Sequence, residues 1–359
     1  MPYPPNYGGV IDVFYKIKAL HEAGAKIHLH CFDYGRGKSD KLLKYCHSVN
    51  YYPRTLTFYK QFSRIPFIVI TRNSKELICN LQKDNYPIIM EGLHCTYPLY
   101  SNNLNSRKII VRSHNIEHEY YDGLAKSEKN PLKKWYFNLE ATKLKQYEIV
   151  LKNATAIAAI SKGDYTHFSK INPHTELVYP FHPFTEVTSK PGKGTYILIH
   201  GDMSVAENIQ STLWLINNVV SKCSFPFIIA GKNPASEIFA AVQSHHNITI
   251  VPNPDDIILG GLVENAHIHL IHSFFPQGFK LKLLHVLFKG RHCICNFDVV
   301  KDTGLESLCR IANDSTEFLE TINELMDTSF DIQLTQTRTE KLRPFSNSIQ
   351  AQKLLKAIF

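Results

Sequence analysis

The 359-residue sequence lacks the short motifs that mark several large enzyme classes. It contains no HExxH, GxSxG or GxxxxGKS/T pattern, so nothing in it indicates a zinc protease, an α/β-hydrolase or a P-loop nucleotidase. Asp-x-Asp is absent too, which argues against a site that holds a sugar nucleotide through manganese. No three-ligand group of His and Cys shows metal-binding spacing, and we therefore expect no metal site.

Long apolar runs are missing as well. No apolar stretch of about 18 residues is present to cross a bilayer, and the opening Met-Pro-Tyr-Pro-Pro does not form a signal peptide. The eight cysteines show no CxxC spacing, since Cys293 and Cys295 are too close together, and most lie in apolar runs like the one around Cys79. Reduced core thiols are typical of the cytoplasm, so we expect a cytoplasmic protein that could touch the inner membrane only peripherally.

Negative charge is the scarcer sign: 32 Asp and Glu face 40 Lys and Arg, for a formal net charge of +8. The excess favours phosphate-bearing partners or an anionic membrane surface. The lysines are scattered and no dense Arg block occurs, so we expect no nucleic-acid partner. A helix expected at 131–152 carries five lysines beside Trp135 and Tyr136, which predicts a weak membrane-surface contact. The alternative is that its Glu–Lys pairs are ordinary helix-surface pairs.

Short apolar runs alternate with amphipathic segments along most of the chain, which is the pattern of βαβ units around a parallel sheet. We therefore expect an α/β protein with two doubly wound domains, at 1–182 and 195–330. A linker rich in Pro and Gly joins them at 183–194, and a helical segment at 331–359 could pack back on the first domain. The expected strands are 27–32, 87–90, 108–112, 155–160, 196–200, 225–230, 248–251, 268–272 and 292–295. The expected helices are 10–23, 131–152, 205–220, 235–242, 255–265 and 279–289.

The N-terminus departs from this pattern. A doubly wound domain normally begins with a buried strand, yet a Gly-Gly turn arrives at residue 8. Residues 1–5 contain three prolines, which a central strand does not accommodate. We therefore expect the first strand of the N-terminal domain to be missing, through a truncated start.

In open α/β sheets, ligands bind beyond the carboxyl ends of the strands, and polar residues of the first half fall there. Gly8 and Gly9 precede a helix, so backbone amides could face an anion, although Gly-Gly before a helix is also common as a plain turn. His114 follows the strand 108–112 directly, with Glu117 just beyond it. A lone His is usually structural, but this placement beside polar residues makes a functional role equally reasonable.

Two strands of the second half end in similar polar turns. Gly201 follows the apolar run of the strand 196–200 and leaves the backbone open to a ligand, and Lys232 follows the next strand. Between them, Ser204 and Glu207 have the spacing of a capping box, which predicts the start of a helix.

The sharpest feature is the run from Gln277 to His285. Lys280 and Lys282 fall in the first turn of the expected helix, where each cation opposes the helix dipole by about 0.3–1 kcal/mol. A bound diphosphate would reverse the sign of that interaction, and Gly278 would let the backbone approach it. The alternatives are that both lysines are only solvated, or that the helix begins a turn earlier.

Taken in order, these motifs are similar to those of GT-B glycosyltransferases, and in particular to the family-4-like retaining group and a Bacteroides-type envelope-polysaccharide branch of it. The resemblance covers nearly the whole chain and rests on five stretches: Pro4–Gly9, Arg112–Tyr121, Gly201–Asn208, Ala230–Pro234 and Gly278–Gly290. It implies two Rossmann-like domains that face each other across a cleft, with the acceptor in the first and the nucleotide sugar in the second.

The resemblance also implies an activity. The protein would be a metal-independent, retaining hexosyltransferase without a cofactor, moving sugar from a UDP- or GDP-linked donor to a saccharide or lipid-linked acceptor in capsule or lipopolysaccharide synthesis. His114 would contact the transferring sugar, and Glu117 is the second catalytic candidate. The donor-binding candidates are Gly8, Gly9, Gly201, Asn208, Lys232, Gly278, Lys280, Lys282 and His285.

The sequence departs from the family at one important place. The usual pair of Glu residues, with seven residues between them, is Gln277 and His285 here. Since the second Glu normally holds the nucleotide ribose, a catalytically impaired sugar-nucleotide-binding or scaffold protein is the main alternative. A third hypothesis, a nucleotide-sugar epimerase, requires extra acid/base carboxylates, of which the sequence shows few.

Overall fold

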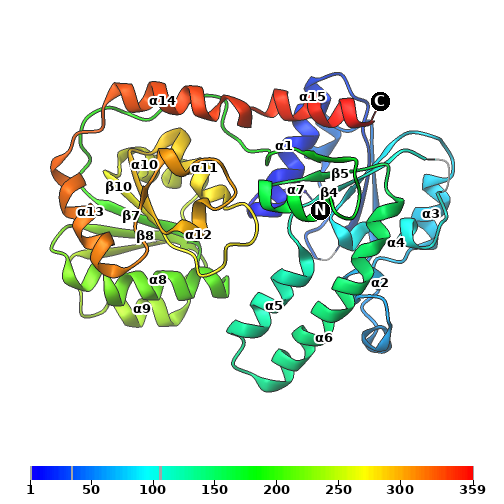
Figure 1. The fold of residues 1–359 in the computed structure, drawn as a ribbon, viewed down its shortest axis with the longest axis horizontal. Helices are drawn as coiled ribbons and strands as arrows, with labels where there is room; N and C mark the ends of the chain where they lie inside the picture. The colour runs from blue at the N-terminus through cyan, green and yellow to red at the C-terminus, as the bar shows by residue number, and fades with distance from the viewer. Residues whose placement is uncertain (1, 34, 105–106, 359) are drawn as a thin grey trace. The chain divides into compact units, whose positions relative to one another are not determined.

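The computed structural model describes residues 2–33, 35–104 and 107–358 (Figure 1). Its contacts divide the chain into two compact units. Unit 1 comprises Met1–Pro183, Gln277–Phe279 and Phe345–Phe359, and unit 2 comprises Phe184–Pro276 and Lys280–Pro344. No described helix is both long enough and apolar enough to cross a membrane.

Unit 2 is built on a six-stranded parallel sheet with the strand order β12-β11-β10-β7-β8-β9. Its strands are β7 (Ile197–Asp202), β8 (Phe227–Lys232), β9 (Ile248–Pro252), β10 (Ile268–Ile271), β11 (His292–Cys295) and β12 (Arg310–Ile311). The first strand of the unit lies between the second and the fourth, which is the order of a doubly wound sheet. Ligands bind such sheets where the strand order reverses, here at the carboxyl ends of β7 and β10.

Helices connect the strands of unit 2 and pack against its sheet. They are α8 (Ala206–Asn218), α9 (Ser236–Val242), α10 (Asp256–Asn265), α11 (Leu281–Lys289), α12 (Phe297–Val300), α13 (Ser315–Asp327) and α14 (Ile332–Leu342). A fully buried core forms around Ile197, Phe227, Ile268 and Phe318, which come from three strands and from α13. Strands buried on both faces explain why their sequences are continuous apolar runs rather than alternating ones.

The sheet of unit 1 is in two pieces. Strand β1 (His28–Asp33) pairs in parallel with β2 (Ser48–Pro53). Strands β3 (Ile88–Glu91), β4 (Ile109–Ser113), β5 (Ala156–Ala159) and β6 (Thr175–Leu177) form a separate parallel sheet in chain order. The helices are α1 (Gly8–Glu22), α2 (Phe67–Ile70), α3 (Lys75–Leu81), α4 (Tyr97–Tyr100), α5 (Glu117–Ser127), α6 (Pro131–Tyr147), α7 (Lys162–Phe168) and α15 (Asn347–Ile358).

The strands of unit 1 belong to two separate sheets, β1-β2 and β3-β4-β5-β6. Described residues 2–7, which precede α1, form no strand. If α1 is counted as the helix that follows a first strand, β1 and β3 become the second and fourth strands. In unit 2 the first strand lies between the second and the fourth, whereas in unit 1 β1 and β3 belong to different sheets.

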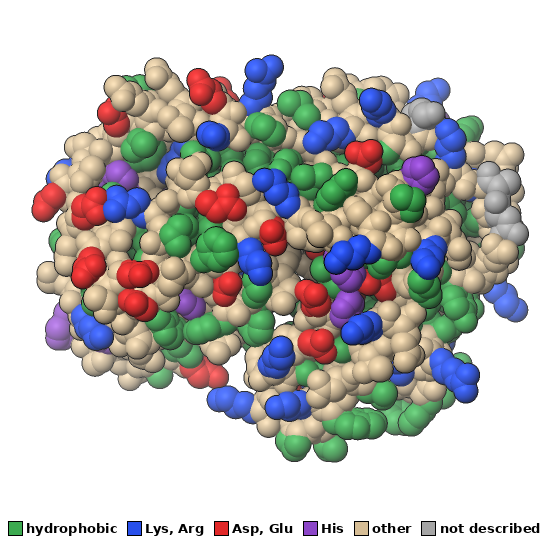
Figure 2. Space-filling view, viewed as in Figure 1, with side chains coloured by type: hydrophobic (Ala, Val, Ile, Leu, Met, Phe, Trp, Pro, Cys, Tyr) green, Lys and Arg blue, Asp and Glu red, His purple; other side chains and the backbone are tan. Residues whose placement is uncertain are grey.

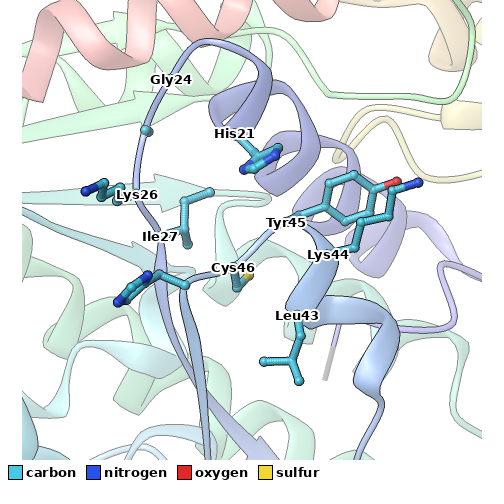
Figure 3. Close-up of a pocket in the computed structure, with 10 residues that line it drawn as sticks. His21, Gly24, Lys26, Ile27, Leu43, Lys44, Tyr45 and Cys46 are labelled. Atoms are coloured by element: carbon cyan, nitrogen blue, oxygen red, sulfur yellow. The ribbon is translucent and has the colours of Figure 1, made fainter.

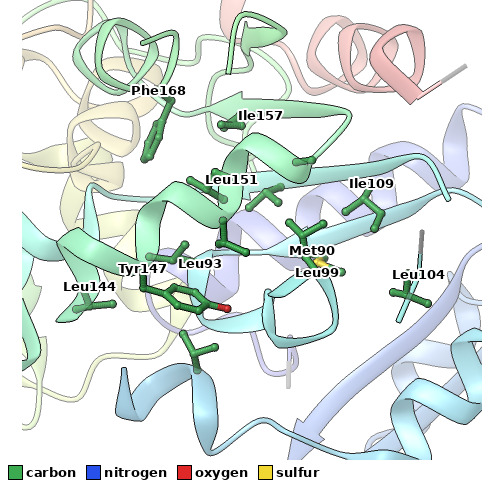
Figure 4. Close-up of a cluster of buried hydrophobic side chains, with 14 of the residues drawn as sticks. Met90, Leu93, Leu99, Leu104, Ile109, Leu144, Tyr147, Leu151, Ile157 and Phe168 are labelled. Carbon is green, nitrogen blue, oxygen red and sulfur yellow. The ribbon is translucent and has the colours of Figure 1, made fainter. Parts of the chain in front are cut away.

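The core of unit 1 lies between its four-stranded sheet and the end of α6. Met90 and Ile109 of the sheet contact a group of buried apolar side chains that includes Leu144, Leu151 and Phe168 (Figure 4). A second cluster joins Leu20 of α1 to Leu354 of α15, so that the last helix of the chain packs beside the first (Figure 1).

Most expected elements are present within a few residues of their predicted ends. The helix expected at 131–152 is α6, whose first turn is capped by the Asn130 side chain, and it continues as a 3-10 turn to Asn153. Three short strands, β2, β6 and β12, were not predicted. They have from two to six residues, and the two shortest, β12 and β6, lie at sheet edges.

Leu144 offers a test of the unit 1 core because its side chain is fully buried in the cluster of Figure 4. Leu144→Ala should lower the free energy of unfolding by about 2–5 kcal/mol, through lost apolar burial and the cavity that remains. Leu132→Ala on the same helix is the control, since Leu132 is 77% exposed and its loss should change stability by less than about 0.5 kcal/mol. Urea denaturation measures both, and equal losses would contradict this assignment of the core.

Candidate active site

Asp12 of α1 is the centre of a buried charge cluster in unit 1. Its carboxylate accepts two hydrogen bonds from the Arg112 guanidinium on β4, Nη2 to Oδ1 at 2.9 Å and Nε to Oδ2 at 3.2 Å. The backbone N–H of Phe181 donates to Oδ1 at 2.8 Å. Burial by itself raises the pKa of Asp12, but the charges of Arg112 and Lys16 and the hydrogen bond from His114 hold it well below its ordinary value. Asp12 is therefore ionised, and it ties α1 to the end of β4.

His114 lies at the edge of this cluster, directly after β4. Its Nε2 is 3.0 Å from Oδ2 of Asp12 and 3.7 Å from Oε2 of Glu91, the last residue of β3. Because Asp12 is an anion, Nε2 carries a proton and donates it to Oδ2 of Asp12. The side chain is 15% exposed, so the ring can reach a ligand and form a hydrogen bond with it.

Lys16 fills the space between the two carboxylates. Its Nζ is 2.6 Å from Oε2 of Glu91 and 3.4 Å from Oδ2 of Asp12. The ligand atoms of Asp12, Glu91 and His114 lie within 4.8 Å of one another, close enough for a metal ion. Lys16 and Arg112 already supply the positive charge that such an ion would bring, so the site suits an uncharged, hydrogen-bonding ligand better than a divalent cation.

Four members of this cluster were not selected as site residues by the sequence analysis: Asp12, Lys16, Glu91 and Arg112, although Arg112 begins one of the stretches that carry the family resemblance. A signal was present, because Asp12 and Lys16 are four residues apart on a helix whose neighbouring positions are apolar. Both are almost fully buried, as only paired charges can be. Glu91 gave no signal of its own, since its partner Lys16 is 75 residues away in the sequence.

Glu117, the second catalytic candidate, begins α5. Burial, with a smaller contribution from the charge of Glu148, raises the pKa of its carboxyl group to about 7. It can therefore either donate or accept a proton near neutral pH. Among the described residues, no hydrogen bond or ion pair joins Glu117 to His114.

Gly8 and Gly9 form the exposed start of α1. Tyr7 precedes them with an extended backbone, and its side chain does not cap the helix. A Cβ on either glycine would meet no atom within 4 Å. The first turn of α1 thus has room for an anion beside its N–H groups.

Lys282 of α11 is the central cation of the unit 2 site. Its Nζ donates to Oδ1 of Asn208 on α8 at 3.1 Å, and Nδ2 of Asn208 donates in turn to the carbonyl oxygen of Asp202, at the end of β7, at 2.9 Å. Burial lowers the pKa of Lys282 to about 8; the charge of Glu207 opposes this shift, and the charge of Lys280 adds to it. Gly201 of β7 lies against Asn208, so this chain of contacts is at the carboxyl end of the central strand.

Lys280 lies beside the same strand end but is neutralised. Its Nζ is 2.9 Å from Oε1 of Glu207, an oxygen that also accepts a hydrogen bond from Ser273 at 2.5 Å. The capping box predicted for Ser204 and Glu207 is therefore wrong. Val205 is the residue before α8, and the Ser204 hydroxyl donates to Asp202 instead. The Glu207 carboxylate pairs with Lys280, 73 residues later in the sequence, and does not cap the first turn of α8. Helix α11 itself begins at Leu281, so it does not start a turn earlier.

The remaining donor-binding candidates are Lys232, His285 and Gly278. Lys232 ends β8 and is partly buried. His285 stacks on Phe184 at 5.0 Å between ring centres, and burial lowers its pKa to about 4, so it is neutral near pH 7. Gly278, which belongs to unit 1 by its contacts, has φ +72°, and a Cβ there would come within 2.4 Å of Oδ1 of Asn115.

Two further groups have metal-compatible spacing, with ligand atoms within 4.8 Å of one another. His118, Glu148 and His167 form one, in which His167 Nε2 is already hydrogen-bonded to Glu148 at 2.7 Å. Cys293, Cys295 and Cys309 form the other, within unit 2. Neither group contains a residue that the sequence analysis selected as a site.

A hollow of about 270 Å³ lies at the other end of α1 (Figure 3). His21, Lys26, Lys44 and His47 line it, beside the start of β1. It is therefore at the amino end of that strand, opposite the end where ligands bind in α/β sheets. We do not assign the active site to this hollow.

Comparison with known proteins supports the fold. No protein-family model matches the sequence. The chain is 24% identical over 346 residues to an uncharacterized 44.6 kDa protein in the cps region of Klebsiella pneumoniae, covering 89% of this chain and 87% of that protein. Among solved structures, it is similar to a sucrose-phosphate synthase from Thermosynechococcus elongatus (TM-score 0.69, 14% identity, 98% and 92% of the two chains covered). It is also similar to Anabaena HepE in complex with UDP-glucose (TM-score 0.64, 13% identity, 98% and 96% covered). The two α/β units thus form a GT-B fold, as predicted.

Asp12 can be tested through stability. Asp12→Asn keeps the side-chain shape but leaves the buried Arg112 without its counter-charge, so the free energy of unfolding should fall by about 3–5 kcal/mol at pH 7. Because the folded-state pKa of Asp12 is depressed, its contribution is fully present above the unfolded pKa of about 3.9 and is lost as the pH falls through the folded value. The gap between wild type and variant should therefore shrink below about pH 4.

Glu22→Gln is the matched control, because Glu22 is on the same helix with a side chain 62% exposed. Its substitution should change stability by less than about 0.5 kcal/mol. Denaturant unfolding at several pH values measures both variants. A constant gap between wild type and Asp12→Asn from pH 7 to pH 3 would contradict the assigned charge of Asp12.

Proposed function

We propose that the protein is a glycosyltransferase that moves a hexose-type sugar from a UDP- or GDP-linked donor to a saccharide or lipid-linked acceptor in cell-envelope polysaccharide synthesis. The observation that carries the proposal is Lys282, a partly buried ammonium group whose pKa is depressed and whose hydrogen-bond partner is a neutral amide. It lies at the carboxyl end of β7, where a doubly wound sheet binds nucleotides.

The donor diphosphate would supply the negative charge that Lys282 lacks. Buried cations are normally paired with carboxylates, and an unpaired one is costly. Here the carboxylate nearest to hand, Glu207, is bound by Lys280 at 2.9 Å. In the proposed reaction the leaving diphosphate gains charge in the transition state, and a fixed ammonium group stabilises it there. The sequence offered Lys280 and Lys282 equally. We therefore propose that Lys282, rather than Lys280, is the main cation that stabilises the leaving diphosphate.

The acceptor would bind in unit 1. His114, held by Asp12, contacts the transferring sugar in this proposal, and Glu117 is the second group able to carry a proton. The acceptor hydroxyl attacks the anomeric carbon of the sugar, the bond from that carbon to the diphosphate oxygen breaks, and the hydroxyl proton passes to the leaving diphosphate. Retention of configuration by this front-face route needs no protein nucleophile, and lysine and backbone amides take the place of a metal ion.

The cellular role in this proposal is suggested by the relative in the cps region of Klebsiella pneumoniae. Capsule or lipopolysaccharide synthesis takes place at the cytoplasmic face of the inner membrane when the acceptor is lipid-linked. We therefore propose a cytoplasmic protein that binds that membrane peripherally.

A second candidate function is supported by His285. The resemblance to family-4-like enzymes assigns this position to the Glu that holds the ribose, but His285 is neutral near pH 7 and stacked on Phe184. A protein that binds a sugar nucleotide without turning it over would tolerate this change. Titrating UDP- and GDP-sugars and following nucleotide release with envelope-derived acceptors separates the two. Release of nucleotide supports transfer, whereas tight binding without release on any acceptor supports the second candidate.

Lys282→Met tests the donor site. Loss of a charge-assisted contact of about 1.5–3 kcal/mol should weaken UDP binding by roughly 10–100-fold at pH 7. The free-protein pKa is about 8, so wild-type affinity for UDP should fall as the pH rises above 8, and the variant should show no such fall. Isothermal titration with UDP and with uridine measures both effects, since the loss should be confined to the diphosphate.

Lys289→Met is the control for this variant. Lys289 is on the same helix but is paired with Glu264 at 3.1 Å. UDP affinity should stay within about twofold of wild type, because this ammonium group already has a carboxylate partner. An equal loss of affinity in both variants would remove the special role given to Lys282.

A further inference from the structure

Large apolar side chains are exposed on two stretches of unit 1. Residues 54–66 follow β2, and residues 129–139 form the start of α6 and the turn before it. Six of their apolar side chains are between 62% and 77% exposed: Leu56, Phe58, Tyr59, Phe62, Leu132 and Trp135. Such a density of exposed apolar residues marks an interaction surface rather than ordinary solvent contact.

The two stretches belong to one face, because the first is fixed to α6. Lys143 of α6 donates from Nζ to the carbonyl oxygen of Gln61 at 2.7 Å. The backbone N–H of Phe67 donates to Oε2 of Glu140, one turn earlier on α6, at 2.6 Å. Both bonds lie within unit 1. Residues 54–66 and 129–139 are together called the α6 face.

The charge of the α6 face has one sign. Its cations are Arg54, Lys60, Arg64, Lys129, Lys133 and Lys134. Neither stretch contains an Asp or a Glu, so their six cations are not balanced within the two stretches. Two of the cations are partly buried: Arg54 donates to Thr71, and Lys60 donates to the carbonyl oxygen of Ile70. In Figure 2, hydrophobic side chains gather along the lower edge, where Figure 1 shows α6, with Lys and Arg side chains among and beside them. Glu140, which the sequence offered as a surface pair for Lys143, is buried. Glu128, one residue before the face, accepts a hydrogen bond from the N–H of Asn130 and is the carboxylate beside these cations.

We propose that the α6 face binds the surface of an anionic phospholipid bilayer. Trp, Tyr and Phe side chains enter the boundary between headgroups and acyl chains, and lysine and arginine pair with the lipid phosphates. The inference deepens the proposed function, since it names the partner that would bring unit 1 to a lipid-linked acceptor, and it needs no contribution from the donor site.

The charge pattern favours a membrane over another protein copy. Two α6 faces brought together would oppose six positive charges to six, which repel at the short distances of an interface. A bilayer with acidic lipids offers the opposite sign and tolerates a loose arrangement of aromatic side chains. The exposed apolar pair on α10 gives the contrast: Ile257 and Ile258 follow Asp255 and Asp256, and we expect no lipid binding there.

Vesicle co-sedimentation of the full chain tests the proposal. Wild type should bind vesicles of phosphatidylglycerol and phosphatidylcholine at least tenfold more tightly than vesicles of phosphatidylcholine alone. Lys133→Glu/Lys134→Glu should weaken binding by more than twentyfold, since each cation near the surface contributes roughly fivefold. Phe62→Ser/Trp135→Ser should weaken it by at least tenfold and leave the salt dependence intact.

Two controls match these variants. Lys301→Glu/Lys341→Glu makes the same change in net charge at exposed positions of unit 2, and Ile257→Ser removes an exposed apolar side chain beside acids. Both should bind vesicles as wild type does. Unfolding midpoints of all variants should agree with wild type, because every substituted side chain is exposed.

Several results would overturn the proposal: no preference of wild type for acidic vesicles, equal losses in the unit 2 controls, or a dimer in light scattering that Phe62→Ser/Trp135→Ser dissociates. Titration with UDP distinguishes failure of the membrane proposal from failure of the proposed glycosyltransferase function. If the membrane proposal fails alone, the α6-face variants bind UDP and transfer sugar as wild type does. If the proposed function fails alone, wild type binds acidic vesicles but not UDP.

Discussion

The buried carboxylate of Asp12 is the constraint on which the rest of unit 1 depends. A guanidinium group inside a protein needs a counter-charge, and Arg112 finds it in Asp12, 100 residues earlier in the chain. The same carboxylate accepts the backbone N–H of Phe181, so that α1, β4 and the segment after β6 meet at one group. The same carboxylate also holds the ring of His114.

The buried cation of unit 2, Lys282, differs from Arg112 of unit 1 because its hydrogen-bond partner is an amide and not a carboxylate. Lys282 is hydrogen-bonded to the neutral Asn208, while the nearby Glu207 is bound by Lys280 and Ser273. Nothing in the folding of a doubly wound sheet requires a lysine at this place, and burial makes it unfavourable, as its depressed pKa reflects. Groups that are held in a locally unfavourable state are a common property of ligand sites. The contrast between a cation with a direct carboxylate partner in unit 1 and one bound to an amide in unit 2 is why we propose an anion site beside Lys282.

The sequence was sufficient to predict the positions of the buried strands, but not which charged residues pair with one another. Buried parallel strands are continuous apolar runs, so those like β7 and β10 could be located to within a residue or two. The strand β12 has two residues, too few to give a periodic signal. Lys280 and Lys282 could be selected because a local pattern places both at a helix start. Asn208 was also a donor-binding candidate, but its pairing with Lys282 could not be predicted, because the two residues are 74 apart in the sequence. The partner of Lys280 was missed, since Glu207 is 73 residues away and the local pattern assigned it to a capping box.

The charges around Asp12 in unit 1 and around Lys282 in unit 2 agree with the proposal that one site binds the acceptor and the other binds the donor. In unit 1, the two carboxylates of Asp12 and Glu91 balance the two cations Lys16 and Arg112. An uncharged hydroxyl can bind there through hydrogen bonds alone, whereas an anion would meet two carboxylates. In unit 2, the single carboxylate of Glu207 is shared by two cations, since it pairs with Lys280 and its charge also acts on Lys282. A neutral acceptor and an anionic donor are the pair of ligands that these two balances favour, which is why we propose glycosyl transfer rather than chemistry on a single nucleotide sugar.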